Sequence, residues 1–270
     1  MPVLSPFNLR IWEPDFGLPT VEPDCLIALT ALKMCNAPVK ISYGSCPQLW
    51  PIPNLVQNDV CLTKSPEFVD ELMKICNIDS KLDSRNQGHC MAYKRYFLES
   101  FEPLFFYDCW IHKVNYQHTI RRWFMSAITF PFNHFYMKSR YKEANERYEC
   151  IKKNNSNEVI VSELYESATR CLEDFNSMLS DNRTYLLGNT PSSLDAIVYS
   201  YLAIALNLPI PDTTFQNLVK NYKYLYKYVR SITRTYYPEL EVKYKYVQPE
   251  NALSDRASNL TLIVAALLDN

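Results

Sequence analysis

The feature of this chain that most limits its fold is a change in hydrophobic periodicity near residue 80 of its 270 residues. Up to that point, strand and helix signals alternate in the order strand, helix, strand, turn, strand, strand, helix. From about Asn86 onward, apolar residues recur at helical spacing almost throughout. We therefore predict an α/β domain over residues 1–80, an all-helical domain over 81–248, and a linker with an apolar tail over 249–270.

Alternating apolar residues mark the strands of the first domain. We expect strands at residues 9–12 and 39–43, the second with period-two alternation. Residues 54–56 and 60–62 flank a Gln-Asn-Asp turn sequence and predict a hairpin. The order of these elements is that of a thioredoxin-like domain.

The two helices of this domain have start signals. Thr20 is the expected N-cap of the first helix, whose first turn holds the acidic residues Glu22 and Asp24. Ser65 is the expected N-cap of the second helix, with Pro66 at the first helical position. Both hydroxyls therefore have a structural explanation.

The helical domain shows apolar stripes with interruptions. Its first stripe consists of Tyr93, Tyr96, Phe97, Ser100, Phe101, Leu104 and Phe105. Pro103 lies inside this run and should kink the helix. Polar residues 152–158 predict a loop before a helix at 159–179, and a last long helix is expected over about 222–236.

One helix is expected to be buried on nearly all sides, because residues 196–206 carry no charged side chain. Ser192 and Asp195 precede it with the spacing of a capping box, in which each side chain accepts a hydrogen bond from the other residue's backbone N–H. We assign this motif a role in folding.

Charge and residue usage exclude several classes of function. The formal net charge is −1 and we expect no clustered basic stripe, which argues against a nucleic-acid partner. The 9 cysteines are scattered, with no CxxC pair and no zinc-ligand spacing, so we predict a reducing compartment and no metal site. Glycine-rich phosphate loops and common nucleophile motifs are absent, and we predict no cofactor.

The domain order resembles that of the glutathione transferases, which pack a thioredoxin-like α/β domain on an all-α domain. The resemblance implies an α+β fold class. Pro53, just before the predicted hairpin, stands where that superfamily carries its cis-proline. The box formed by Ser192 and Asp195 resembles the one that opens the superfamily's buried core helix.

Further motifs resemble the metaxin family, closest to its metaxin 1/3 branch, over about residues 9–240. The sequence FGLPTV at 16–21 resembles the metaxin opening that follows a strand tryptophan. The segments W-I, N-Y, R-W and FPFNHF within 110–135 resemble the metaxin mid-region in order and spacing. The sequence YSYLA at 199–203 resembles the metaxin core helix.

This resemblance implies an adaptor on the cytosolic face of the mitochondrial outer membrane. Metaxins are associated with the sorting and assembly machinery that inserts β-barrel proteins. They pair with a second, metaxin 2-like protein, and in animals they help link mitochondria to motor adaptors. We expect the same partners here.

The glutathione site of a transferase is incomplete in this sequence. Such an enzyme needs a hydroxyl or thiol after its first strand, where Thr20 is the only hydroxyl here. It also needs an acidic or amide residue before a serine, and Lys64 precedes Ser65 instead. We regard Pro53, Lys64 and Ser65 as a vestigial cleft and predict no catalytic residue. The alternatives are a glutathione-dependent transferase using Thr20 or Ser65 and a soluble cytosolic docking module.

An aromatic-rich stretch is the candidate contact region for a partner. Its residues are Trp110, Tyr116, Arg122, Trp123, Phe130, Pro131, Phe132 and Asn133. Core packing is the alternative for most of them, and Trp123 is expected to pack inward from a solvated helix face. Asp108, nearby, is read either as a buried, hydrogen-bonded carboxylate or as a surface group at a helix end.

The C-terminal tail is a candidate membrane segment. Its apolar residues are Leu260, Leu262, Ile263, Val264, Leu267 and Leu268. As a helix, residues 260–268 would rise about 14 Å, less than the roughly 30 Å of a bilayer's hydrocarbon core. We expect the start of a C-terminal membrane anchor, and the alternative is a docking helix packed on the domain.

Overall fold

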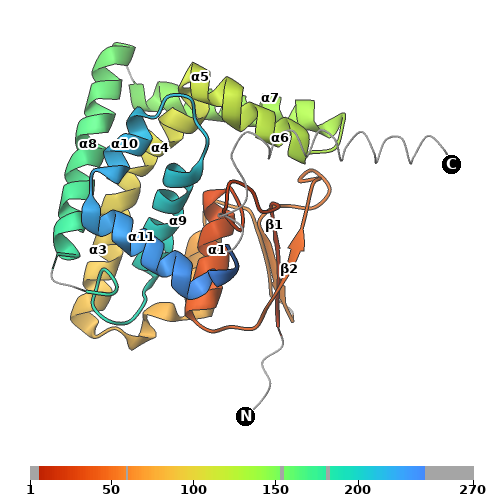
Figure 1. Cartoon of the computed structure of the whole chain (residues 1–270). Coiled ribbons are helices and arrows are strands. Elements are labelled where there is room, and N and C mark those ends of the chain that lie inside the picture. The colour runs from red at the N-terminus through yellow and green to blue at the C-terminus, as the bar shows by residue number, and fades with distance from the viewer. Residues whose placement is uncertain (1–5, 59, 153–154, 181–182, 241–270) are drawn as a thin grey trace.

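The computed structural model describes residues 6–58, 60–152, 155–180 and 183–240. A small sheet with its helices stands beside an assembly of longer helices (Figure 1). Among the described residues, no helix is both long enough and apolar enough to cross a bilayer. The predicted membrane tail, from Leu260 to Leu268, lies outside the described residues.

The sheet has four strands in the order β2-β1-β3-β4. Its strands are β1 (Phe7–Ile11), β2 (Val39–Tyr43), β3 (Asn54–Gln57) and β4 (Val60–Thr63). β1 runs parallel to β2 and antiparallel to β3, and β3 pairs antiparallel with β4. The predicted strands and the predicted hairpin are therefore confirmed. The parallel pair is connected by helix α1 (Pro23–Met34), as a parallel crossover requires.

Helices make up the rest of the molecule. After α2 (Phe68–Cys76), they are η1 (Ile78–Lys81), α3 (Ser84–Ser100), α4 (Glu102–Phe106), η2 (Tyr107–Ile111), α5 (Lys113–Asn115), η3 (Tyr116–Ile120), α6 (Arg121–Ala127), α7 (Phe132–Lys152), α8 (Asn157–Met178), α9 (Ser193–Asn207), α10 (Thr214–Lys220) and α11 (Lys223–Tyr236). The predicted kink is confirmed: α3 ends at Ser100, and Pro103 lies in the first turn of α4. The predicted break between the two long helices at 152–158 is confirmed by the end of α7 and the start of α8.

Helix α9 is the centre of the fold. Its side chains are buried from Ser193 to Ala205, and it packs against α1, so that it joins the sheet side of the molecule to the helical side. Asp195 accepts hydrogen bonds from the backbone N–H of Ser192 and of Leu186, each at 2.9 Å, and from the Tyr228 hydroxyl at 2.9 Å. The predicted capping box and the predicted burial of this helix are confirmed.

Both predicted caps in the first domain are wrong. Helix α1 begins at Pro23, and the Thr20 hydroxyl is buried without a hydrogen-bond partner among the described residues. Helix α2 begins at Phe68, and Ser65 contributes its carbonyl, which accepts from the Phe68 N–H at 3.1 Å. For α1 the reason is Pro23, which favours the first helical turn and so starts the helix after Glu22.

Candidate functional site

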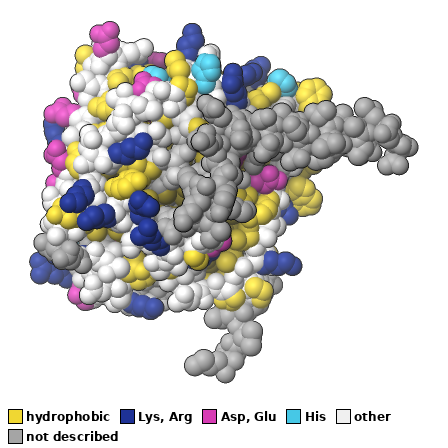
Figure 2. Space-filling view, viewed as in Figure 1, with side chains coloured by type: hydrophobic (Ala, Val, Ile, Leu, Met, Phe, Trp, Pro, Cys, Tyr) yellow, Lys and Arg dark blue, Asp and Glu magenta, His cyan; other side chains and the backbone are white. Residues whose placement is uncertain are grey.

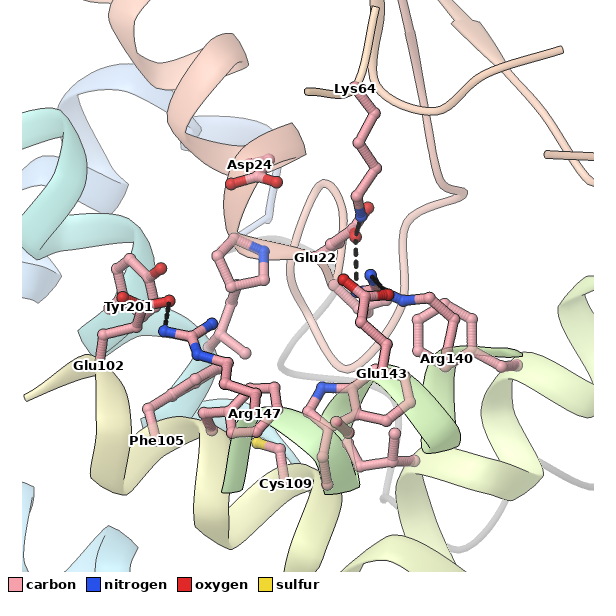
Figure 3. Close-up of a pocket in the computed structure, with 18 of the residues that line it drawn as sticks. Glu22, Asp24, Lys64, Glu102, Phe105, Cys109, Arg140, Glu143, Arg147 and Tyr201 are labelled. Atoms are coloured by element: carbon pink, nitrogen blue, oxygen red, sulfur yellow. Dashed lines mark hydrogen bonds and ion pairs between the residues drawn. The ribbon is translucent and has the colours of Figure 1, made fainter. Parts of the chain in front are cut away.

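A cleft of about 600 Å³ lies where the start of α1 and the loop at 64–66 face helices α4, α6, α7 and α9. Figure 3 shows that its wall combines acidic and basic side chains with aromatic rings. The labelled residues are Glu22, Asp24, Lys64, Glu102, Phe105, Cys109, Arg140, Glu143, Arg147 and Tyr201. The predicted vestigial residues Lys64 and Ser65 both line this cleft.

Pro53 positions this cleft without lining it. The Ile52–Pro53 peptide is cis, as predicted. The Pro53 carbonyl accepts a hydrogen bond from the Lys64 N–H at 3.1 Å. This hydrogen bond joins the two ends of the β3–β4 hairpin and so fixes the position of the Lys64 backbone at the cleft.

Glu22 is the centre of a charged network in the cleft. It immediately precedes α1, and only 6% of its surface is exposed. Its carboxylate accepts a hydrogen bond from the Trp12 indole N–H at 2.9 Å and pairs with the Lys64 ammonium. A guanidinium nitrogen of Arg140, from α7, lies 3.8 Å from the same carboxylate. Three segments distant in the sequence thus converge on one buried acid.

The cations keep Glu22 ionised. Burial by itself would raise the pKa of Glu22, but Coulombic attraction to Lys64 and Arg140, with hydrogen bonds from Lys64 and Trp12, lowers it below the ordinary value. A buried carboxylate without such partners would be neutralised instead. The network is therefore an internal ion pair and not an available acid.

Arg140 is shared between several neighbours. Its guanidinium donates to Glu143 at 3.0 Å and lies over the Trp110 ring, 5.3 Å from the centroid. A second pair lies further along the cleft, where Arg147 donates to Glu102 at 2.9 Å and covers the ring of Phe106 at 4.7 Å. The basic side chains of the cleft wall are thus occupied by acids and rings of the same chain.

Asp24 is the exception among the cleft carboxylates. Burial, followed by repulsion from Glu22, raises the pKa of Asp24 to about 6. It lies in the first turn of α1, and Figure 3 shows no hydrogen bond from it to the labelled cations. It can therefore exchange a proton near neutral pH, and the described residues contain no cluster of side chains that could hold a metal ion.

The thiols near the cleft are not activated. Burial raises the pKa of Cys109, which lines the cleft, far above its ordinary value. Burial and the charge of Glu22 do the same to Cys25. Thr20, the hydroxyl considered for thiolate binding, does not line the cleft. Ser65 does line it, beside a lysine whose ammonium is already paired with Glu22.

Several of the predicted contact residues lie in the core, which is the alternative that the sequence left open for most of them. Trp110 is 9% exposed, Trp123 is 2% exposed and Asn133 is 7% exposed. The Trp123 ring packs at 5.8 Å against that of Trp12, and its indole donates to Asp15 at 2.7 Å. These rings pack between the sheet and the helices, so their surface is buried within the chain and is not available to a partner.

The rest of the predicted contact region is at the surface. Tyr116 is half-buried, Arg122 is exposed, and the turn around the cis Phe130–Pro131 peptide is exposed, with Phe130 at 73%. Phe132, at the start of α7, is 36% exposed. These side chains are free to contact another molecule.

The structure adds three exposed residues to the predicted contact set: Leu49, Trp50 and, on α7, Phe135. The loop after β2 exposes Leu49 at 63% and Trp50 at 59%. A hydrogen bond joins this loop to the start of α7: the Gln48 amide donates to the Phe132 carbonyl at 3.0 Å. In Figure 1, this loop and the turn before α7 lie close together on the right-hand side of the molecule. We name Leu49, Trp50, Phe130, Phe132 and Phe135 the aromatic patch. A Leu-Trp pair between prolines in a loop was the available sequence signal.

Of the two alternatives for Asp108, a buried carboxylate or a surface group at a helix end, the structure shows the buried carboxylate. It is 2% exposed and accepts a hydrogen bond from the Asn115 amide at 3.1 Å. Burial, reinforced by the charge of Asp212, raises the pKa of Asp108 to about 7. The groups that shift its pKa are Asp212 and Asn115, and they include no cation of the kind that surrounds Glu22.

Comparison with known proteins identifies the family. Residues 25–141 match the Tom37 family, described as an outer mitochondrial membrane transport complex protein, and residues 168–232 match the C-terminal domain of glutathione S-transferases. A metaxin-1 homolog of Caenorhabditis briggsae is 30% identical over 88% of this chain and 76% of its own length. Metaxin-1 of Mus musculus is 29% identical over 87% and 76%, and metaxin-3 of Xenopus laevis is 26% identical over 85% and 76%.

Solved structures show the same fold at low identity. An apo glutathione S-transferase III has a TM-score of 0.51 at 13% identity, covering 91% of this chain and 100% of that chain. A Ceriporiopsis subvermispora glutathione S-transferase in complex with glutathione has a TM-score of 0.55 at 12% identity, covering 86% and 97%. The predicted α+β, glutathione-transferase-like fold is confirmed. With a transferase fold and extended similarity to metaxin-1 and metaxin-3, the chain belongs to the metaxin family of outer mitochondrial membrane transport proteins.

Proposed function

We propose that this chain is a non-enzymatic adaptor subunit on the cytosolic face of the mitochondrial outer membrane, acting in the sorting and assembly of β-barrel proteins. The observation that supports it best is the pairing of Glu22 with Lys64 and Arg140 inside the cleft. The groups that would bind and ionise a thiol tripeptide are engaged with one another. Coupling of mitochondria to motor adaptors is a second part of the proposal, and it rests on the family resemblance alone.

The proposed partner is a second metaxin, bound through the aromatic patch. Monomeric proteins rarely leave such rings together on the surface, and large aromatic side chains dominate the energy of protein interfaces. Phe130 and Phe135 are 73% and 67% exposed, and neither is needed to fill the core. A relative with the same two-domain shape could cover both loops at once.

Affinity purification from mitochondria tests the partner. We expect the tagged chain to retain a second metaxin-like protein, and Phe130→Glu with Phe135→Glu to reduce its recovery at least about tenfold, since burying a charge in an interface is costly. Met91→Glu is the matched control, because Met91 on α3 is 71% exposed and lies outside the patch. Equal losses for control and patch variants, or unchanged recovery for both, would overturn the docking assignment.

The enzymatic alternative has its own test. A glutathione-dependent transferase would be retained on a glutathione resin, and Ser65→Ala would abolish this retention. We expect no retention of the wild-type chain, because the Lys64 ammonium beside Ser65 is paired with Glu22. Retention that is lost on Ser65→Ala would favour the transferase.

A further inference from the structure

A basic stripe runs along α10 and α11. It consists of Lys220, Lys223, Lys227, Arg230 and Arg234, all of them exposed. Within α11, separations of three or four residues place the last four cations on one face, and Lys220, at the end of α10, lines the same hollow as they do. Figure 2 shows this gathering of dark blue side chains on the left half of the visible face. The sequence expectation of no clustered basic stripe is wrong, because tyrosines and apolar residues separate the cations in the sequence.

The stripe has no acidic counterpart within its own segment. Residues 213–237 contain no Asp or Glu, although the whole chain has a net charge of −1. Among the ion pairs of the described residues, none involves Lys220, Lys223, Lys227 or Arg230. This contrasts with the cleft, where Lys64, Arg140 and Arg147 are all paired. The positive charge is therefore directed at solvent.

The surface around the stripe is hollowed and aromatic. Lys220, Arg230 and Arg234 line a hollow of about 570 Å³ together with Asn207 and Tyr226. A second hollow of about 550 Å³ continues along the same helix. The Tyr226 ring is 38% exposed and lies 5.9 Å from the Arg230 guanidinium. Cations beside exposed tyrosines form a surface suited to the boundary between water and lipid headgroups.

We propose that the basic stripe binds the phosphate headgroups of anionic phospholipids and lays the helical domain against the bilayer. A membrane fits better than an acidic protein, because the cations stand beside exposed tyrosines on the outer face of one helix, and tyrosine is enriched at the level of the lipid headgroups. Clusters of four or more Lys or Arg on an amphipathic helix are attracted to anionic lipid surfaces. This inference goes beyond the proposed adaptor role and does not depend on the partner or on the cleft.

Vesicle flotation of the full chain tests the proposal. We expect binding to vesicles of phosphatidylcholine with anionic phosphatidylinositol or cardiolipin to exceed binding to pure phosphatidylcholine vesicles, and to weaken as salt rises. Each Lys or Arg near an anionic surface contributes about fivefold in partition. Lys223→Gln, Lys227→Gln and Arg230→Gln together should therefore lower binding to the anionic vesicles roughly a hundredfold and leave binding to phosphatidylcholine unchanged.

A matched triple variant controls for net charge. Lys74→Gln, Lys81→Gln and Arg85→Gln remove the same charge from exposed positions on another part of the surface and should keep the anionic preference. Circular dichroism and the melting temperature establish that both variants fold. Equal binding of both triple variants to anionic vesicles would overturn the proposal. The proposal would also fail if the stripe variant lost an acidic protein partner but still bound anionic vesicles as the wild type does. It would fail as well if the wild-type chain bound free inorganic phosphate at millimolar concentration but showed no preference for anionic vesicles.

Discussion

The cleft and the aromatic patch differ in how their side chains are used: those of the cleft interact with one another, and those of the patch are exposed. In the cleft, the Glu22 carboxylate pairs with Lys64 and Arg140 and accepts a hydrogen bond from the Trp12 indole, so that charged groups of one chain neutralise one another. At the patch, Phe130 is 73% exposed, and its ring contacts that of His134 at 6.0 Å. The charged side chains of the cleft are therefore used within the chain, whereas the rings of the patch remain accessible, and our proposal places the partner there.

Removal of the central cleft acid should have the largest effect. Glu22→Ala leaves Lys64 and Arg140 in a largely buried site without their carboxylate, and we expect a loss of about 3–5 kcal/mol in the free energy of unfolding. Urea denaturation measures it. Glu99→Ala is the control, because it breaks the exposed Arg95–Glu99 pair and should cost less than about 1 kcal/mol. Equal costs for the two variants would mean that the cleft network is not structural.

The pH dependence of stability should separate two kinds of buried carboxylate. Asp108 has a folded pKa of about 7, above its ordinary value, so its contribution to stability is fully present below the ordinary aspartate pKa of about 4, declines as pH rises above that value and is lost once pH passes about 7. Asp108→Asn should remove roughly 2 kcal/mol of the decline between pH 5 and 8. Denaturant midpoints across this range measure the effect, and parallel curves for wild type and variant would contradict it.

Glu22 should behave in the opposite sense. Its folded pKa is lowered, so its contribution is present above the ordinary glutamate pKa and is lost as pH falls through the folded value. Glu22→Gln should therefore be less sensitive to acid below about pH 4 than the wild-type chain. A variant that lost stability in acid as steeply as the wild type would show that the paired carboxylate is not the cause.

The fold was predictable where its determinants are local. Ser192 and Asp195 are three residues apart, so the capping box can be recognised from the sequence alone. The uncharged run after them predicts a buried helix even when its neighbours are unknown. Thr20 and Ser65 misled because both hydroxyls precede helices, whereas Pro23 sets the actual start of α1. A cap depends on backbone angles that residue type alone does not fix.

The sequence predicted Lys64 and Ser65 at the cleft, but not the ion-pair network around Glu22, because its residues are far apart in the sequence. Glu22 and Lys64 are separated by 42 positions, and Arg140 comes from α7. In the sequence, Glu22 is explained fully as an acidic residue near a helix N-terminus. The same limit applies to Trp110, whose burial depends on how η2 packs against α7. The inward packing of Trp123 was expected from the sequence and is confirmed.

The smallest effect on stability is expected at the aromatic patch. Trp50→Ala should change the free energy of unfolding by less than about 0.5 kcal/mol, because the side chain is 59% exposed. The same variant should reduce recovery of the proposed metaxin-like partner, since tryptophan is a frequent energetic centre of interfaces. Urea denaturation and quantitative co-purification measure the two effects. A large loss of stability with partner recovery intact would assign Trp50 to the core instead.

Calorimetric titration of the wild-type chain with glutathione tests the central claim most directly. We predict no saturable binding at millimolar glutathione, because the Lys64 ammonium beside Ser65 is paired with Glu22 and the Thr20 hydroxyl does not line the cleft. Saturable binding, accompanied by conjugation of a standard electrophile and lost on Ser65→Ala, would contradict the account.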